Sequence, residues 1–166
     1  FDVLLAEAVI GQDTRAHVDD GASVNAGDLT VATYGLDTGL PAESSRAATA
    51  SVVVGNVALV GANGADTSAS ITGDVEAYID AGATITLGGA ALVDAVSVST
   101  ADSSGEGGSG GIVTASVMFV AADISGDTRA WVGDDLTLES DSLTVSASAE
   151  NSVTADELSV AIAVAG

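Results

Sequence analysis

The feature that most constrains the fold is a twelve-residue pattern that occurs three times, at residues 13–24, 74–85 and 127–138. The starts of these copies are 61 and 53 residues apart. Each copy begins with aspartate, continues as Ala-x-Val or Ala-x-Ile, and then reaches a turn rich in aspartate and glycine. Long repeats of this kind are typical of chains whose similar units stack on one another, because one unit alone cannot bury its apolar face.

Within each repeat, the apolar residues expected to point inward recur five or six positions apart. They are Val18, Val24 and Leu29; Ile79, Ile85 and Ala90; and Val132, Leu138 and Leu143. Strands this short, joined by Asp- and Gly-rich corners, suit a chain that winds around an axis. The pattern therefore predicts an all-β fold, a parallel β-solenoid (β-helix) of about three long repeats. The general preference for right-handed crossovers favours right-handed winding.

We expect a single solenoid domain over residues 1–166, with repeat units at about 1–60, 61–112 and 113–166. Two segments are predicted as loops, 33–47 and 97–111. The first contains the only proline, Pro41, and the second contains a Ser/Gly-rich run of a kind typical of flexible linkers. Both ends of the sequence share one strand pattern and lack a polar cap. This predicts either a piece of a longer array or units that stack end to end.

The composition fits a narrow interior and excludes several classes of protein. Hydrophobic residues make up 47% of the chain, mostly Ala and Val, with only two Phe, two Tyr and one Trp. The chain has 24 acidic residues but only three arginines and no lysine. The resulting net charge of -21 argues against nucleic-acid binding, because it repels phosphate. The absence of cysteine excludes disulfides and thiolate zinc sites. No apolar run approaches the roughly 20 residues of a membrane span.

Acidic residues recur at the corners of the three repeats. In stacked strands about 5 Å apart, equivalent carboxylates repel one another unless a cation or a basic group lies between them. Arg15 and Arg129 can neutralise part of such a column, and calcium is the natural candidate cofactor for the rest. The alternative is that these are solvated turn residues. The predicted calcium ligands are Asp13, Asp19, Asp20, Asp74, Asp80, Asp127, Asp134 and Asp135.

One outward position of the repeat carries an aromatic ring in every copy. It is occupied by His17, Tyr78 and Trp131. A position that accepts all three residue types predicts a stacked surface ladder between neighbouring strands rather than a catalytic base. The alternative is that the ladder contributes to binding a sugar or a neighbouring fibre.

The sequence does not predict an enzyme. Polysaccharide-active β-helix enzymes need paired carboxylates in a groove, or a basic residue beside calcium. The adjacent acids Asp19 and Asp20 point apart in a strand or turn, the chain has no lysine, and His17 is its only histidine. No Ser-His-Asp set is completed.

The repeat resembles those of giant bacterial surface adhesins, in particular filamentous-haemagglutinin-like and leukotoxin-like β-solenoid proteins. The resemblance is carried by Ala-x-Val or Ala-x-Ile, Asp-Gly-Ala at 20–22 or Asp-Ala-Gly-Ala at 80–83, a short strand, Ala-Gly or Gly-Gly, and an alternating Ala/Val strand. It implies a long rigid stalk exported to the cell surface. This chain departs from the family in its acidity and in its scarcity of asparagine ladders.

Together these features predict a structural or adhesive β-solenoid module of an extracellular filament or giant cell-surface protein. We expect copies of the chain to associate end to end or laterally. The alternatives are a calcium-dependent module that binds glycan or matrix and, less favoured, a polysaccharide-active β-helix enzyme.

Overall fold

The computed structural model describes residues 2–34 and 44–163. All regular secondary structure in these residues is β, and every pair of neighbouring strands is parallel. The predicted all-β class is therefore confirmed, together with the parallel arrangement. The parallel sheets are open, with a first and a last strand in each.

The strands form four parallel sheets, which we call sheets A to D. Sheet A contains β1 (Asp2–Ile10), β6 (Val60–Ile71) and β10 (Val113–Ile124). Sheet B contains β2 (Thr14–Val18), β7 (Val75–Ile79) and β11 (Thr128–Val132). Sheet C contains β3 (Ser23–Ala26), β8 (Thr84–Leu87) and β12 (Thr137–Glu139). Sheet D contains β4 (Leu29–Ala32), β5 (Ser44–Val57), β9 (Ala90–Gly111) and β13 (Ser142–Ala163).

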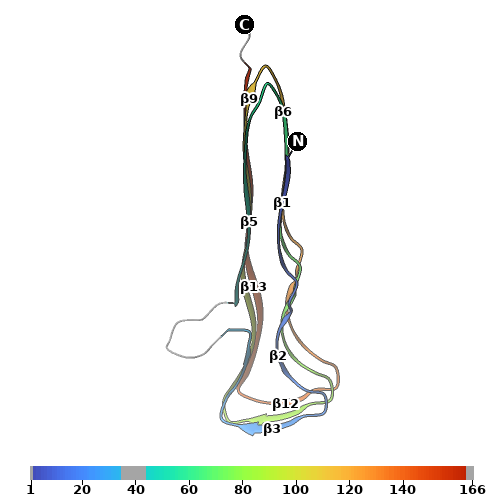
Figure 1. Cartoon of the computed structure of the whole chain (residues 1–166). Coiled ribbons are helices and arrows are strands. Elements are labelled where there is room, and N and C mark those ends of the chain that lie inside the picture. Colours follow the sequence, from blue (N-terminus) through green and yellow to red (C-terminus); the bar gives the residue numbers. More distant parts are fainter. Residues whose placement is uncertain (1, 35–43, 164–166) are drawn as a thin grey trace.

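The chain visits the sheets in the order A, B, C, D three times. We call β1–β5 the first pass, β6–β9 the second pass and β10–β13 the third pass. Figure 1 shows the three passes superimposed, with sheets A and D as two long facing layers and sheets B and C closing the wider end. The second pass is central, because its strands pair with the first pass on one side and with the third on the other.

The pairing register follows the alignment of the sequence repeats. Val75 lies opposite both Thr14 and Thr128, at the offsets of 61 and 53 residues that separate the repeats. Equivalent side chains therefore stack directly above one another in columns through the three passes.

The long strand β9 corrects the loop predicted at 97–111. Residues 97–111 form the C-terminal two thirds of this 22-residue strand, which is paired with β5 on one side and β13 on the other. The glycines make room for sheet A: a Cβ at Gly105 would lie 2.5 Å from Met118 Cε, and one at Gly107 would lie 2.8 Å from Met118 Sδ. Gly105 and Gly107 thus lie in a strand paired on both sides, where the Met118 side chain of the facing layer packs against them.

Two further predictions concern the loop at 33–47 and the inward position of Ala90. Of the loop, residues 44–47 belong to β5, and residues 35–43 lie outside the described residues. Ala90 is exposed, whereas the next residue, Ala91, is buried and lies opposite Leu29 and Leu143. The inward phase of this strand is therefore shifted by one residue from the prediction.

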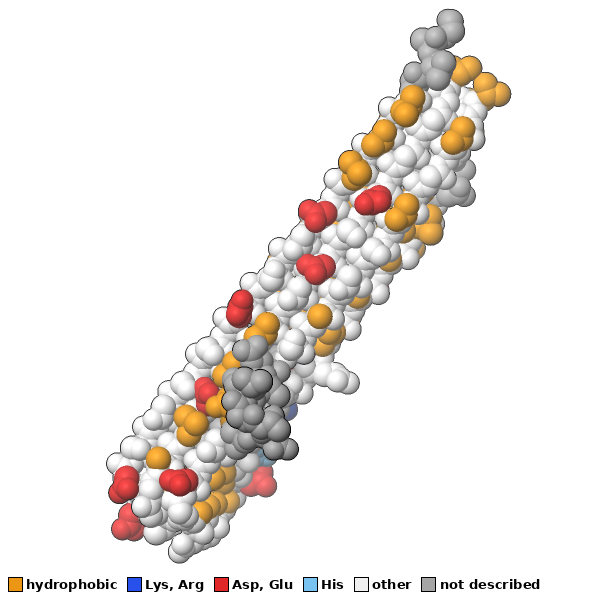
Figure 2. All heavy atoms as spheres, turned by 90° about the vertical axis from the view of Figure 1, so that its left-hand side faces the viewer, with side chains coloured by type: hydrophobic (Ala, Val, Ile, Leu, Met, Phe, Trp, Pro, Cys, Tyr) orange, Lys and Arg blue, Asp and Glu red, His pale blue; other side chains and the backbone are white. Residues whose placement is uncertain are grey.

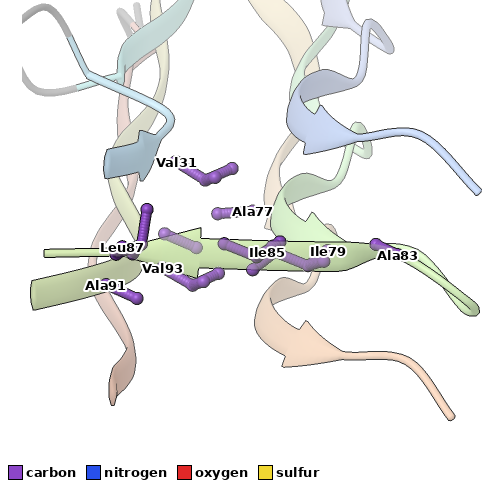
Figure 3. Close-up of a cluster of buried hydrophobic side chains, with 9 residues drawn as sticks. Val31, Ala77, Ile79, Ala83, Ile85, Leu87, Ala91 and Val93 are labelled. Atoms are coloured by element: carbon purple, nitrogen blue, oxygen red, sulfur yellow. The ribbon is translucent and has the colours of Figure 1, made fainter. Parts of the chain in front are cut away.

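The best-buried side chains belong to the second pass. Ile71, Ile79 and Ile85 have no exposed surface, whereas Val24 and Leu138, which lie opposite Ile85, are only partly buried. Figure 3 shows a core cluster at the wide end that includes Ile79 and Ile85, where side chains from sheets B, C and D meet. The hydrophobic core is thus concentrated where one pass is covered from both sides.

The corner between sheets B and C contains one residue with positive φ in each pass. Gly21 and Gly82 have φ of 64° and 68°, and Asp135 takes the equivalent position with φ of 56°. Glycine adopts this left-handed conformation without a steric penalty, whereas other L-residues bring Cβ too close to the backbone.

Replacing Asp135 with glycine is therefore expected to raise the free energy of unfolding by about 0.5–1 kcal/mol, because the left-handed conformation costs a non-glycine residue energy. Urea denaturation measures the difference. Asp134→Gly is the matched control, because it removes the same charge from the same turn but Asp134 has no positive φ. A gain no larger for Asp135→Gly than for Asp134→Gly would contradict the prediction.

Candidate functional site

The outer face of sheet B brings together the charged and aromatic residues of the repeat. Strand alternation places Ala16 and Val18 toward the core and leaves Arg15 and His17 exposed. The parallel register repeats this arrangement in β7 and β11, so that columns of outward side chains cross the three strands.

The aromatic column forms a continuous stack. The rings of His17 and Tyr78 have centroids 5.0 Å apart and planes 12° apart. The rings of Tyr78 and Trp131 are closer, with centroids 4.2 Å apart and planes 8° apart. The structure therefore brings the three predicted ladder residues together, and the contacts link all three passes.

The charged column beside the aromatic one is centred on Glu76, which sequence reasoning did not single out. Its Oε2 accepts a hydrogen bond of 2.7 Å from Arg15 Nε, and its Oε1 lies 3.6 Å from Nη1 of Arg129. The Glu76 side chain is only 10% exposed, so a single carboxylate lies between two guanidinium groups. The alignment of the three repeats contains the signal, because Glu76 occupies the position of the two arginines.

Neighbouring carboxylates raise the pKa of both arginines, which are charged near neutral pH in any case. The hydrogen bond with Glu76 raises the pKa of Arg15, with a further contribution from the charge of Asp13. The pKa of Arg129 is raised chiefly by its hydrogen bond with Asp127. Neither group is therefore suited to exchange a proton near neutral pH.

A third column contains Asp13, Asp74 and Asp127, three of the predicted calcium ligands. Asp13 Oδ1 accepts a 3.0 Å hydrogen bond from the backbone N–H of Asp74, and Asp74 Oδ1 accepts one of 2.9 Å from that of Asp127. Arg15 donates to Asp13, and Arg129 donates to Asp127. Arg15 and Arg129 thus pair with part of the column, as the sequence predicts, and backbone amides bind the Asp13 and Asp74 carboxylates.

The remaining predicted ligands lie at the corners that follow sheet B. Asp19, Asp20, Asp134 and Asp135 are exposed, and Asp80 is half-buried. Asp19 Oδ1 lies 3.0 Å from Nε2 of His17. Within residues 2–34 and 44–163, no three acidic or histidine side chains converge on a position where a metal ion would bind.

Shallow apolar hollows on the outer faces of sheets A and D are a second candidate site. On sheet D, a hollow of 350 Å³ is floored by Gly108 and Gly110 and bordered by Val57, Val160 and Ile162. On sheet A, a hollow of 290 Å³ is lined by Val3, Leu5, Gly64, Ala65, Asp66, Val117 and Phe119. Figure 2 shows apolar side chains concentrated toward the narrow end of sheet D. Neither hollow contains a pair of carboxylates or a base for hydrolysis.

Comparison with protein-family models, with curated proteins and with solved structures finds no match for this chain. The resemblance to giant adhesin repeats therefore stays a prediction from the sequence. No helix long and apolar enough to cross a membrane occurs among the described residues.

Proposed function

We propose that this chain is a structural β-solenoid module, a rigid segment of an extracellular filament or a large cell-surface protein. The observation that carries the proposal is the threefold passage of the chain through the same four sheets in one register. Parallel hydrogen bonding at about 4.8 Å per pass is the arrangement by which a solenoid extends along its axis.

The outer face of sheet B supports a structural function. Its aromatic, acidic and basic columns each connect neighbouring passes, with the buried Glu76 carboxylate bridging Arg15 and Arg129. Contacts of this kind hold the passes in register, because a shift of one residue would separate every pair.

The surface charge also suits a long exposed particle. A net charge of -21 gives copies a strong mutual repulsion, which opposes clumping through unpaired strand edges. The extracellular location is inferred from this acidity and from the resemblance to adhesin repeats. No specific observation in the described residues favours the calcium-dependent module or the polysaccharide-active enzyme.

Amide hydrogen exchange tests the solenoid proposal. We expect the slowest exchange in β6–β9, because these strands are hydrogen-bonded on both sides and their inner faces are buried. Exchange in β1–β5 and β10–β13 is expected to be faster by about tenfold or more. Equal rates in the three passes would contradict the proposed stacking.

A calcium titration separates the structural module from the calcium-dependent alternative. The unfolding temperature is expected to stay unchanged at millimolar calcium, with magnesium as the control for ionic strength. A rise in the unfolding temperature with calcium but not with magnesium would contradict a structural module that needs no metal. The reason is that a ligand that binds the folded state stabilises it.

A further inference from the structure

We propose that the free edge of the third pass is shaped to receive a parallel pass of the second-pass type and to reject the first pass of another copy. This inference rests on the proposed solenoid module and specifies the chemistry of its neighbour. A second-pass type has glycine at the corner before sheet B and an acidic residue opposite Arg129. Two separate columns lead to this description.

The first column is the corner between sheets A and B, formed by Gln12, Gly73 and Gly126. A Cβ on Gly73 would lie 2.0 Å from the backbone oxygen of Gln12, and a Cβ on Gly126 would lie 2.1 Å from that of Gly73. Each pass that stacks on a preceding pass therefore needs glycine at this corner. A copy stacked on the third pass would bring the Cβ of Gln12 against the carbonyl of Gly126, whereas a second-pass type presents Gly73.

The second column is the charged one. Arg15, Glu76 and Arg129 alternate in sign, and Glu76 contacts both arginines. A first pass stacked on the third would place Arg15 beside Arg129, and like charges directly opposite each other destabilise a sheet. A pass with an acidic residue at this position would continue the alternation.

The third-pass edge also has a reason to be covered. Its inward apolar side chains are incompletely covered, because no strand lies beyond them in the described residues. Ile124, Val132, Leu136 and Leu138 are partly buried, and Leu143 and Val145 are exposed. The unpaired backbone groups of β10–β13 are a template for parallel pairing. The two columns thus select a second-pass type and oppose the direct end-to-end stacking of copies that the sequence predicts.

Two four-pass proteins test this inference. One carries residues 62–111 fused after Gly166, and the other carries residues 1–57 fused at the same point. We expect the added second-pass segment to dock, which slows amide exchange in β10–β13 by about tenfold or more. The added first-pass segment is expected to remain unprotected and sensitive to protease.

A rescue variant keeps the test informative if the first-pass fusion is simply unstable. Gln12→Gly and Arg15→Glu, introduced only in the added copy, should restore its protection. Equal protection in the two original fusions, or better protection by the first-pass segment, would overturn the inference. Protection by neither added segment would overturn it as well, while the exchange pattern of the unmodified chain tests the solenoid module independently.

The unmodified chain supplies one more measurement. Sedimentation equilibrium is expected to show a mass that stays at the monomer value as the concentration rises. Rods that lengthen with concentration and show the edges of the first and third passes protected would overturn the proposed rejection of copies.

Discussion

Replacing Gly73 with alanine is expected to lower the free energy of unfolding by about 3 kcal/mol or more, at the upper end of the cost of overpacking. The new Cβ would lie 2.0 Å from the backbone oxygen of Gln12. A flexible side chain could move away from this contact, but a backbone carbonyl in a hydrogen-bonded corner cannot. The second pass must therefore separate from the first or distort, and urea denaturation measures the loss.

Gly88→Ala is the matched control, since Gly88 also lies at a corner of the second pass but a Cβ at this position would meet no atom within 4 Å. Its stability is expected to change by less than about 1 kcal/mol, because alanine at an unstrained position also restricts the unfolded chain. Gly126→Ala should reproduce the large loss, because its Cβ would lie 2.1 Å from the oxygen of Gly73. If Gly73→Ala were as well tolerated as Gly88→Ala, the close stacking at this corner would be wrong.

Ile85→Ala is expected to lower the free energy of unfolding by about 2–5 kcal/mol, the usual cost of a large-to-small change in a core. Ile85 has no exposed surface and lies between Val24 of the first pass and Leu138 of the third. Both neighbours are held by backbone pairing, so they cannot collapse into the cavity. Urea or thermal denaturation gives the difference directly.

The comparison within one column makes this prediction specific. Leu138→Ala removes a side chain from the same column, but at the open edge of the third pass, where Leu138 is only partly buried. Its expected cost is about 1–2 kcal/mol, because less apolar area is taken from water. Equal losses for the two substitutions would show that the second pass is not the core.

Much of the architecture could be predicted because its signals are local and repeated. The alternation of Ala16 and Val18 with outward residues specifies a strand with one inner face. The repeat alignment also places Val75 with Thr14 and Thr128, which is the pairing register that the structure shows. A repeated local pattern thus carries long-range information, because equivalent residues in stacked passes become neighbours.

The predicted loop at 97–111 shows where composition misleads. A run of serine and glycine has two physical meanings: a chain without enough apolar surface to order, or a strand that packs closely against another layer. The second holds for residues 97–111, because they are paired on both sides within β9 and Met118 packs against the positions of Gly105 and Gly107. Met118 lies in another pass of the chain, so no local pattern could reveal it.

The acidic corners are a second case in which the partners of a residue depend on the stacking of the passes. The sequence places Asp13, Asp74 and Asp127 in one column and raises the question of what neutralises them. The structure answers it with backbone amides of the next pass and with two arginines, and it adds Glu76 as the bridge between those arginines. The direction of each side chain and the donors above it depend on how the passes are stacked.

By itself, the sequence determined the all-β class, the repeat register and the columns of equivalent residues, because strand alternation and Asp/Gly corners act within a few neighbouring residues. Only the tertiary structure decided which small residues leave room for the side chains of a facing sheet. It also decided which charged side chains already have a partner, and that the second pass is the core. Those properties depend on what lies on the other side of each strand, about 5 Å away in space and more than 50 residues away in the chain.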